Sequence, residues 1–395
     1  MSESAERLMV LVPDRITDIL VKGEYQPNYY NPGQLFSEVH IVTTTDDRPD
    51  LAQLQRTVGR ARLHVHNVPE NSLLVSADWR RWWKKPLRDW AQPGVDLARR
   101  TKPQLIRVHG ADWDGYLASR IRKALGIPYV LSLHINPDVN PVRRFVAPGL
   151  TESQRQHNAF FQYVEGAGLK NADLVMPVYR SILPYLERHG VTRVEVCYNI
   201  LNSPYLRQKT DYSMRGPFRI VCVGRLFQDK NPANLIRAVA ALPSVELTIV
   251  GDGPERASLE QLARESAAAS RVHFRPAVEN DELCQLLPGF DLFAVHTEFW
   301  ELNKSVLEAL LAGLPVVINR RHGPPVPELA GADFVRFVDN TTDSYREAIQ
   351  DLMEDDAARA ALGRRAYAHA QPNWSPQVTE RKVLDIYRRF MRPPA

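Results

Sequence analysis

Short apolar segments rich in β-branched residues alternate with helix-length segments along the whole chain, and this alternation restricts the fold more than any other feature. Such segments form βαβ units, in which parallel strands are covered by helices on both faces. We therefore predict an α/β protein. The predicted strands lie at residues 8–12, 39–42, 105–109, 129–133, 174–178 and 194–196, then at 218–224, 247–251, 271–275, 291–295, 315–319 and 334–338.

Two domains are expected, because 395 residues exceed what one hydrophobic core organises. Residues 202–217 are polar, lack periodicity and carry Pro at both ends, which is typical of a linker. We predict a Rossmann-like domain over 1–205, a second one over 206–372, and a helix over 373–395 that packs back on the first domain. Two doubly wound domains of this kind would face each other across a cleft and bind ligands at the carboxyl ends of their strands.

The composition, 44% hydrophobic and 24% charged, is that of an ordinary globular protein. The N-terminal apolar run of about five residues is far shorter than the roughly 20 needed to span a bilayer. The three cysteines form no C-x-x-C pair, so neither a disulfide framework nor a zinc knuckle is indicated. We expect a cytoplasmic protein, for which peripheral contact with the inner face of a membrane stays open.

The modest net charge of +4 is unevenly distributed. Residues 80–150 contain fourteen Lys and Arg and five Asp and Glu, a surplus of nine positive charges. On a helical projection, residues 77–90 have an aromatic face and a basic face, as an interfacial helix on anionic lipid headgroups would. The alternative, more frequent for such patterns, is a surface helix whose Trp stripe packs on the sheet. The aromatic sector holds Trp79, Trp82, Trp83, Leu87 and Trp90, and the basic sector holds Arg80, Arg81, Lys84, Lys85 and Arg88.

Two cations follow the predicted strand 218–224. Gly224 would let the chain turn tightly, and Arg225 and Lys230 on one loop could both reach a diphosphate. Neither a P-loop nor G-x-G-x-x-G is present. The alternative is a solvated loop whose charges pair with Asp229 or Asp252.

The segment 291–318 has the order strand, polar loop, helix, then Gly-Leu-Pro before another strand. Its helix should begin near Asn303, whose side chain could cap it, and its free amides should face the same cleft as the two cations. Glu308 lies inside this helix among apolar neighbours, where a carboxylate could accept two hydrogen bonds from a ribose diol. Gly251 and Gly253 end another strand and by themselves indicate a structural turn.

Together these motifs resemble the donor half of the retaining family 4 glycosyltransferases of GT-B fold. The resemblance rests on V-G-R-L-x-x-x-K, G-D-G-P and L-E-A-L-L-A-G-L-P-V-V within residues 218–318. It implies two facing Rossmann-like domains and a nucleoside diphosphate sugar donor. It also implies that Arg225 and Lys230 bind the donor diphosphate, that Glu308 binds the ribose, and that Gly251 belongs to the family's G-D-G-P turn.

One departure concerns the first Glu of the family's E-x7-E motif, which would hold the donor sugar. That position falls on Trp300, while Glu301 is one residue late and Glu298 two residues early. We predict that Glu301 serves through a shifted loop; the alternative is that Trp300 packs on the sugar. Three residues replace the family's Gly-rich stretch, and their amides, with the Lys304 ammonium, are predicted to meet the phosphates: Asn303, Lys304 and Ser305.

Histidines mark the first domain. Two predicted strands within 105–134 end at His109 and His134, and His134 matches the family's His that faces the donor sugar. The alternative is a half-buried His satisfied by a backbone carbonyl. His64 and His66 alternate on a probable strand and could share a face. No third ligand lies at metal-site spacing and the family needs no metal, so we interpret both as structural.

The resemblance predicts transfer of a sugar from a UDP- or GDP-sugar to an acceptor with retained anomeric configuration, without metal or other cofactor. Arg225, Lys230 and the amides near 303–306 would stabilise the departing diphosphate, and His134 and Glu301 would position the sugar. The acceptor stays open among a lipid-linked saccharide, a small metabolite and a polysaccharide; nucleic acid is not expected. The alternatives are a sugar-nucleotide epimerase of the same fold and a catalytically silent binding subunit.

Overall fold

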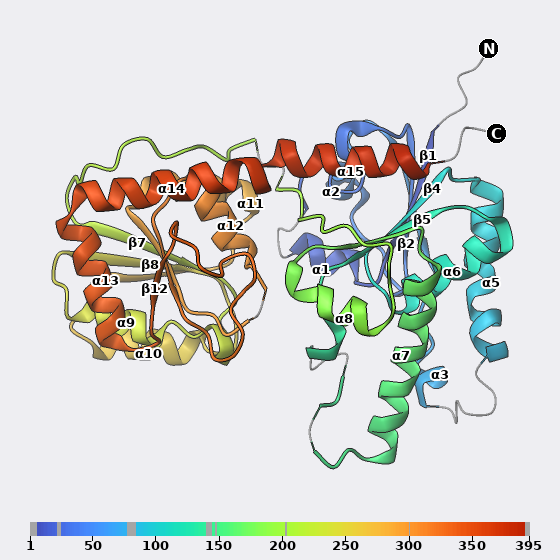
Figure 1. Ribbon diagram of the computed structural model, residues 1–395, viewed down its shortest axis with the longest axis horizontal. Helices are drawn as coiled ribbons and strands as arrows, with labels where there is room; N and C mark the ends of the chain where they lie inside the picture. The colour runs from blue at the N-terminus through green and yellow to red at the C-terminus, as the bar shows by residue number, and fades with distance from the viewer. Residues whose placement is uncertain are drawn as a thin grey trace. The chain divides into compact units, whose positions relative to one another are not determined.

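The chain forms two compact units (Figure 1). The computed structural model describes residues 6–21, 25–76, 84–139, 144–146, 148–201, 204–299 and 301–391. The first unit holds the described residues up to Ile200 and again those from Thr379 onward, and the second holds the described residues of Leu201–Val378. The chain therefore returns to its first unit after completing the second.

Parallel strands make up the sheet of the first unit, in the order β3-β2-β1-β4-β5-β6. The order runs outward from β1 in both directions, which is the pattern of a doubly wound fold. The strands are β1 (Arg7–Val12), β2 (Glu38–Thr43), β3 (Arg62–Asn67), β4 (Leu105–Val108), β5 (Tyr129–Leu133) and β6 (Leu174–Pro177).

Helices bury both faces of this sheet. Met9 and Leu11 of β1 contribute to the core beneath α5, α6 and α7, whereas Leu8 and Val10 contribute to a second core on the other face. Every described residue from Leu8 to Val12 is buried, as expected for a strand covered on both sides. The helices are α1 (Ile16–Val21), α2 (Leu51–Gln55), α3 (Ser72–Ser76), α5 (Lys84–Thr101), α6 (Trp113–Leu125), α7 (Glu152–Asn171) and α8 (Leu183–Arg188), with short 3-10 turns η1 (Pro32–Gln34), η2 (Pro137–Val139) and η3 (Arg180–Ile182).

The last helix, α15 (Pro376–Phe390), belongs to the second core of the first unit. Val383, Ile386 and Tyr387 are buried in that core, and the Tyr387 ring lies 6.0 Å from the Phe36 ring. The carboxylate of Glu380 also accepts a hydrogen bond from the Gly33 amide at 2.7 Å. The amphipathic pattern of the C-terminal segment thus supplies one layer of a unit built mainly from the start of the chain.

The second unit repeats the architecture with the parallel order β12-β11-β10-β7-β8-β9. The predicted α/β fold class is therefore confirmed. The strands are β7 (Phe218–Val223), β8 (Val245–Val250), β9 (Val272–Arg275), β10 (Leu292–Val295), β11 (Val316–Asn319) and β12 (Arg336–Val338). The helices are α9 (Ala233–Ala240), α10 (Arg256–Glu265), α11 (Asn280–Leu286), α12 (Lys304–Leu311), α13 (Thr342–Glu354) and α14 (Asp356–Trp374), with 3-10 turns η4 (Gln228–Lys230) and η5 (Leu287–Gly289).

Two details differ from the sequence predictions. The predicted strand at 194–196 is reduced to an isolated bridge between Val194 and Val175, because only one residue pair reaches bridging geometry. The predicted linker at 202–217 does not only connect the two units, because part of it makes specific contacts. The Lys209 amide donates to the Ala312 carbonyl at 2.8 Å and the Tyr212 hydroxyl donates to the Gly313 carbonyl at 2.7 Å, so this stretch packs on the second unit.

The aromatic and basic segment at 77–90 is described only from Lys84 onward, as the start of α5. Trp79, Trp82, Trp83, Arg80 and Arg81 lie outside the described residues. Trp90 packs inward: its ring lies 4.7 Å from the Trp113 ring and its Nε1 donates to the Pro69 carbonyl at 2.7 Å. Trp90 therefore packs against the protein interior, as in the alternative of a surface helix, and is not directed toward a membrane. Among the described residues, no helix has the length and apolar composition needed to cross a membrane.

Candidate donor-binding site in the second unit

The carboxyl ends of β7 and β10 lie side by side in the second sheet, and the start of α12 closes over them. The Ser305 hydroxyl donates to the Val223 carbonyl at 3.0 Å, which ties the first turn of α12 to the end of β7. A pocket of about 20 Å³ opens where these elements meet. It is lined by Cys222, Val223, Gly224, Leu226, Lys230, Val295, His296, Asn303 and Ser305. The structure therefore brings together four predicted site residues that lie up to 81 positions apart in the chain.

Lys230 and Arg225 rest on aromatic rings. The Lys230 ammonium lies 4.2 Å from the centroid of Phe299 and the Arg225 guanidinium 4.6 Å from that of Phe227. Within the described part of the chain neither cation forms an ion pair. Burial, with the nearby Arg225 charge, lowers the pKa of Lys230 to about 8, against the opposing effect of Glu301. Two cations held at strand ends without a carboxylate partner form a site suited to an anion.

The alternative pairing with Asp252 does not occur. The Asp252 carboxylate lies 2.6 Å from the Arg256 guanidinium, at the start of α10, and accepts a hydrogen bond from the Ala277 amide at 3.0 Å. These bonds hold the pKa of Asp252 below its ordinary value. Asp252 thus anchors the loop after β8 and leaves the two cations on the loop after β7 available.

The structure explains the glycines of these two loops differently from the sequence analysis, which predicted that Gly224 permits a tight turn. Gly224 has no left-handed φ, and a Cβ added to it would meet nothing within 4 Å, so the turn does not require glycine there. Gly251 has φ of 143°, and a Cβ on it would lie 2.0 Å from the Gly224 carbonyl oxygen. Gly253 has φ of 157° and packs equally tightly on the Leu226 carbonyl. Gly251 and Gly253 let the two loops touch, whereas Gly224 leaves open space beside the pocket.

The acidic residue predicted to bind ribose is buried inside α12. Only 2% of Glu308 is exposed, its Oε1 accepts a hydrogen bond from the Asn280 amide at the start of α11, and the Lys304 ammonium lies 4.0 Å away. The ammonium of Lys304, which was predicted to meet the phosphates, thus forms an ion pair with Glu308 in this structure. Asn303 occupies the N-cap position of α12, as expected, but its side chain makes no capping hydrogen bond, so the predicted side-chain cap is wrong. The backbone there is extended, with ψ of 137°.

Glu298, Trp300 and Glu301 are the candidates for the position of the first motif Glu. Of these, Glu298 makes structural hydrogen bonds. Its carboxylate accepts hydrogen bonds from the Asn319 side chain at 3.0 Å and the His322 amide at 2.8 Å, and the His322 ring lies 3.2 Å away. Glu298 thus fastens the loop after β10 to the loop after β11. Trp300 lies outside the described residues. Glu301 is half-buried and its charge acts on Lys230, so its sugar-binding role stays a prediction.

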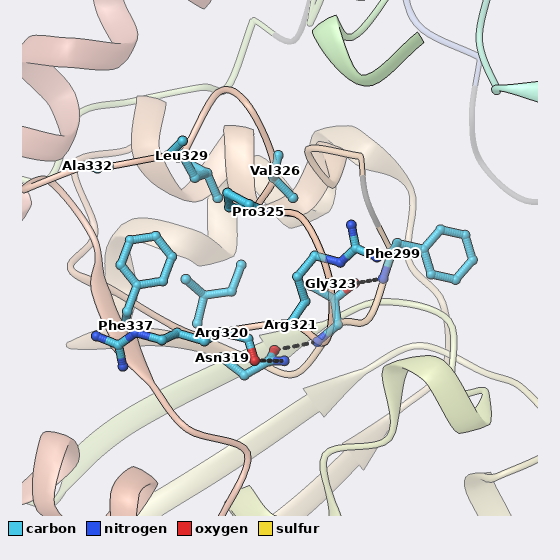
Figure 2. A pocket seen from close by; sticks show the side chains of 14 residues that line it. Phe299, Asn319, Arg320, Arg321, Gly323, Pro325, Val326, Leu329, Ala332 and Phe337 are labelled. Carbon is cyan, nitrogen blue, oxygen red and sulfur yellow. Dashed lines mark hydrogen bonds between the residues drawn. The ribbon is translucent and has the colours of Figure 1, made fainter. Parts of the chain in front are cut away.

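A larger pocket of about 530 Å³ lies between the ends of β10 and β11 and the loop that follows (Figure 2). Pro325, Val326 and Leu329 form one wall, opposite Arg320 and Arg321. Its lining also includes Phe299, the ring that carries Lys230. The larger pocket therefore adjoins the cation site, and both belong to the second unit.

In the first unit, His134 follows β5 and His109 follows β4. The two rings are stacked with centroids 5.4 Å apart, and neither Nε2 makes a hydrogen bond to a described residue. Burial, together with the charge of Arg107, lowers the pKa of His134 to about 3, so this imidazole is neutral at physiological pH. Among the described residues, no backbone carbonyl accepts a hydrogen bond from Nε2 of His134, contrary to the structural alternative for that nitrogen.

The sequence did not indicate Asn280 and Phe299 as parts of this site, and it offered Glu298 only as a candidate for the first motif Glu. Asn280 precedes Glu308 by 28 positions and lies on another helix, and Phe299 supports a lysine 69 positions earlier. Phe299 and Glu298 did stand in the polar loop after a predicted strand, which was the available signal. Nothing local signals Asn280, since its partner is set by how α11 and α12 pack.

Two family patterns match this chain. "Glycosyl transferases group 1" matches residues 209–369 and "Glycosyl transferase 4-like domain" matches residues 34–199. Each covers most of one unit, and together they account for both. The chain therefore belongs to the family 4 glycosyltransferases, as the motifs predicted.

Relatives and solved structures agree with this family. The chain is 30% identical over 185 residues to a lipopolysaccharide core biosynthesis glycosyltransferase, LpsE, of Rhizobium meliloti, covering 47% of this chain and 52% of the relative. It is 31% identical over 189 residues to a D-inositol 3-phosphate glycosyltransferase of Mycobacterium marinum, covering 46% and 40%. The chain thus spans about half the length of the curated relatives it matches. Anabaena Alr3699/HepE, solved in complex with UDP, has a TM-score of 0.68 at 17% identity over 97% of this chain and 100% of that one, which confirms the GT-B fold.

Proposed function

We propose that this protein is a glycosyltransferase that moves a sugar from a nucleoside diphosphate sugar to an acceptor hydroxyl, with retention of anomeric configuration. One observation carries the proposal. Arg225 and Lys230 lie without a carboxylate partner, among the described residues, beside the start of α12, whose first-turn amides carry partial positive charge. A diphosphate would complete this arrangement.

The chemistry follows from where charge develops. When the bond between the anomeric carbon and the diphosphate oxygen breaks, negative charge builds up on the diphosphate. Lys230, Arg225 and the α12 amides would stabilise that charge, which replaces a metal ion at this position. The acceptor oxygen attacks the anomeric carbon from the face that the diphosphate leaves, and its proton passes to the departing phosphate. No protein nucleophile is then required.

The remaining predicted residues would hold the donor. Glu308 would accept hydrogen bonds from the ribose diol, with Asn280 fixing the orientation of its carboxylate. Glu301 would hold the sugar hydroxyls, and neutral His134 would offer one ring nitrogen to the sugar or diphosphate. The pocket of about 530 Å³ beside Phe299 falls in the size range of small-molecule sites, which supports it as the place for a further part of a substrate.

The donor and the acceptor are each proposed as a chemical class, a nucleoside diphosphate sugar and an anionic acceptor. The UDP in the Alr3699/HepE structure supports a uridine donor as the first choice, with guanosine donors next. The relative that acts on D-inositol 3-phosphate supports an anionic acceptor, which would suit the excess of basic residues at 80–150. The peripheral membrane location proposed for the protein rests on the same basic segment.

Nucleotide binding is the first test. UDP, GDP and ADP, each alone and as the sugar conjugate, would be compared for their effect on the melting temperature of the full chain, because selective ligands stabilise the fold by mass action. Transfer would then be followed as release of nucleoside diphosphate with and without acceptor. Release that needs an acceptor supports a transferase. An epimer formed from donor alone would identify an epimerase, and no turnover with any donor that binds would identify a silent subunit.

Substitution of the cations tests the site itself. Lys230→Ala and Arg225→Ala should each lower turnover by about 100-fold or more, the usual effect of losing one such electrostatic donor. Arg237→Ala is the matched control, since Arg237 is exposed on α9 and its guanidinium donates a hydrogen bond to the Asn234 side chain at 3.1 Å. Near-normal transfer by both site variants would refute the diphosphate assignment.

A further inference from the structure

A cluster of imidazoles and one carboxylate lies on the edge strand β3 and its neighbour β2 in the first unit, two strands that hold no residue of the proposed donor site. Glu38 and His40 are two positions apart on β2, and His64 and His66 are two positions apart on β3. The strands pair in parallel with His40 beside His64. Because side chains alternate along a strand, all four therefore project from the same face of the sheet.

The distances within the cluster are those of a metal site. Oε1 of Glu38 lies 3.0 Å from Nε2 of His64 and 3.3 Å from Nε2 of His40, and the three ligand atoms lie within 4.8 Å of one another. Bonds of about 2.0–2.1 Å at tetrahedral angles separate two ligand atoms by about 3.4 Å. Both measured separations from Glu38 are close to that value.

Two imidazole nitrogens and a carboxylate oxygen lie close together here, an arrangement that a bound cation would stabilise. Both Nε2 atoms are buried within 3.3 Å of Oε1 of Glu38, yet neither is aligned for a hydrogen bond with it or with another described residue. Two imidazole nitrogens and a carboxylate oxygen form the ligand set that Zn²⁺ favours over Mg²⁺ or Ca²⁺.

Outer partners already orient two of the ligands. The Arg7 guanidinium donates to Oε2 of Glu38 at 3.1 Å, which leaves Oε1 toward the histidines. Nδ1 of His40 lies 3.2 Å from Nε2 of His66, and when the shared proton lies on Nδ1 of His40, its Nε2 carries the lone pair. Such second partners are typical of metal-bound imidazole and carboxylate.

We propose that Glu38, His40 and His64 bind one divalent transition-metal ion, with Zn²⁺ the preferred ion and water as the fourth ligand. The His40 and His64 rings lie 11° from parallel, so each would turn about χ2 to aim its nitrogen at a common point. His64 is 36% exposed, which gives the ion a way in and leaves a coordination position for water. The ion would cross-link the edge strand β3 to β2.

The test is metal binding by the untagged full chain after chelator treatment. Calorimetric titration with Zn²⁺ should give one site per chain, and Co²⁺ in its place should give the intense visible absorption of tetrahedral coordination. His64→Gln and Glu38→Gln should each weaken Zn²⁺ binding by more than the roughly 10- to 100-fold that loss of an outer partner costs. His66→Gln should fall within that smaller range.

His273→Gln serves as the control, because His273 is an exposed strand histidine on β9 of the second unit. It should bind Zn²⁺ as the unsubstituted chain does. His64 lies on an edge strand and is partly exposed, so its variant should fold; melting in chelator checks this. Equal Zn²⁺ affinity in the unsubstituted and His64→Gln chains, or an octahedral Co²⁺ spectrum, would overturn the proposal.

Discussion

Lys230 shows how one buried cation can prepare a site for an anion. Its ammonium lies on the Phe299 ring with Arg225 close by, and burial lowers its pKa from 10.5 to about 8. The charged form is therefore less favourable than in water, although the ammonium still predominates at pH 7. A diphosphate would raise this pKa again, since an opposite charge within a few ångströms favours the ammonium.

This lowered pKa predicts a pH dependence. Between pH 8 and 10.5 the unfolded chain holds the Lys230 proton and the folded chain does not, so this residue makes unfolding harder as pH rises through that window. UDP binding should instead take up a proton above pH 8, and its affinity should fall up to about tenfold per pH unit. Calorimetry at pH 9 in buffers of different ionisation enthalpy measures the uptake. Lys230→Arg should show none; equal uptake by both chains would contradict the prediction.

At the scale of elements, the site depends on the loops after β7 and β8, whose backbones are in direct contact. Gly251, after β8, approaches the carbonyl of Gly224, after β7, more closely than any side chain would permit. The two glycines therefore have separable roles. Gly251 serves the packing of the loops, and Gly224 serves the space in front of them.

Alanine at each position should separate these roles. Gly251→Ala should destabilise the second unit by roughly 1–3 kcal/mol, because the new Cβ overlaps a backbone oxygen and the φ of 143° strains it. Gly224→Ala should leave the melting temperature unchanged yet weaken UDP binding, if the diphosphate occupies the open space. Thermal melting and nucleotide titration of both variants check this. A destabilised Gly224→Ala chain with normal affinity would show that the glycines have the reverse roles.

The whole molecule combines two similar units of different charge. The excess of basic residues lies in the first half, and α15 returns to the same unit through Val383, Ile386 and Tyr387. Within the described part of the basic segment, Lys85 pairs with Asp89 at 2.6 Å, so not every cation of α5 is available to a partner.

Charge reversal tests whether this surplus meets an anionic surface. Replacing four basic residues with Glu should reduce binding to vesicles of anionic lipid, by about 1 kcal/mol for each residue near the surface. These are Arg80, Arg81, Lys84 and Lys85. The control reverses four exposed residues of the second unit: Arg207, Arg215, Arg237 and Arg264. Vesicle sedimentation and the KM for acceptor are the measurements; equal losses in both chains, or none, would leave 77–90 as a solvated helix face.

Local sequence determined the α/β class, the two units and the loops that hold the cations, because strand periodicity and the residues just after a strand are neighbours in the chain. Arg225, Lys230 and Ser305 could be found in this way. Only the tertiary structure decided which strands pair and which helices meet. His40 beside His64, Asn280 against Glu308 and Glu298 on the loop after β11 depend on sheet order and helix packing, which no local pattern encodes.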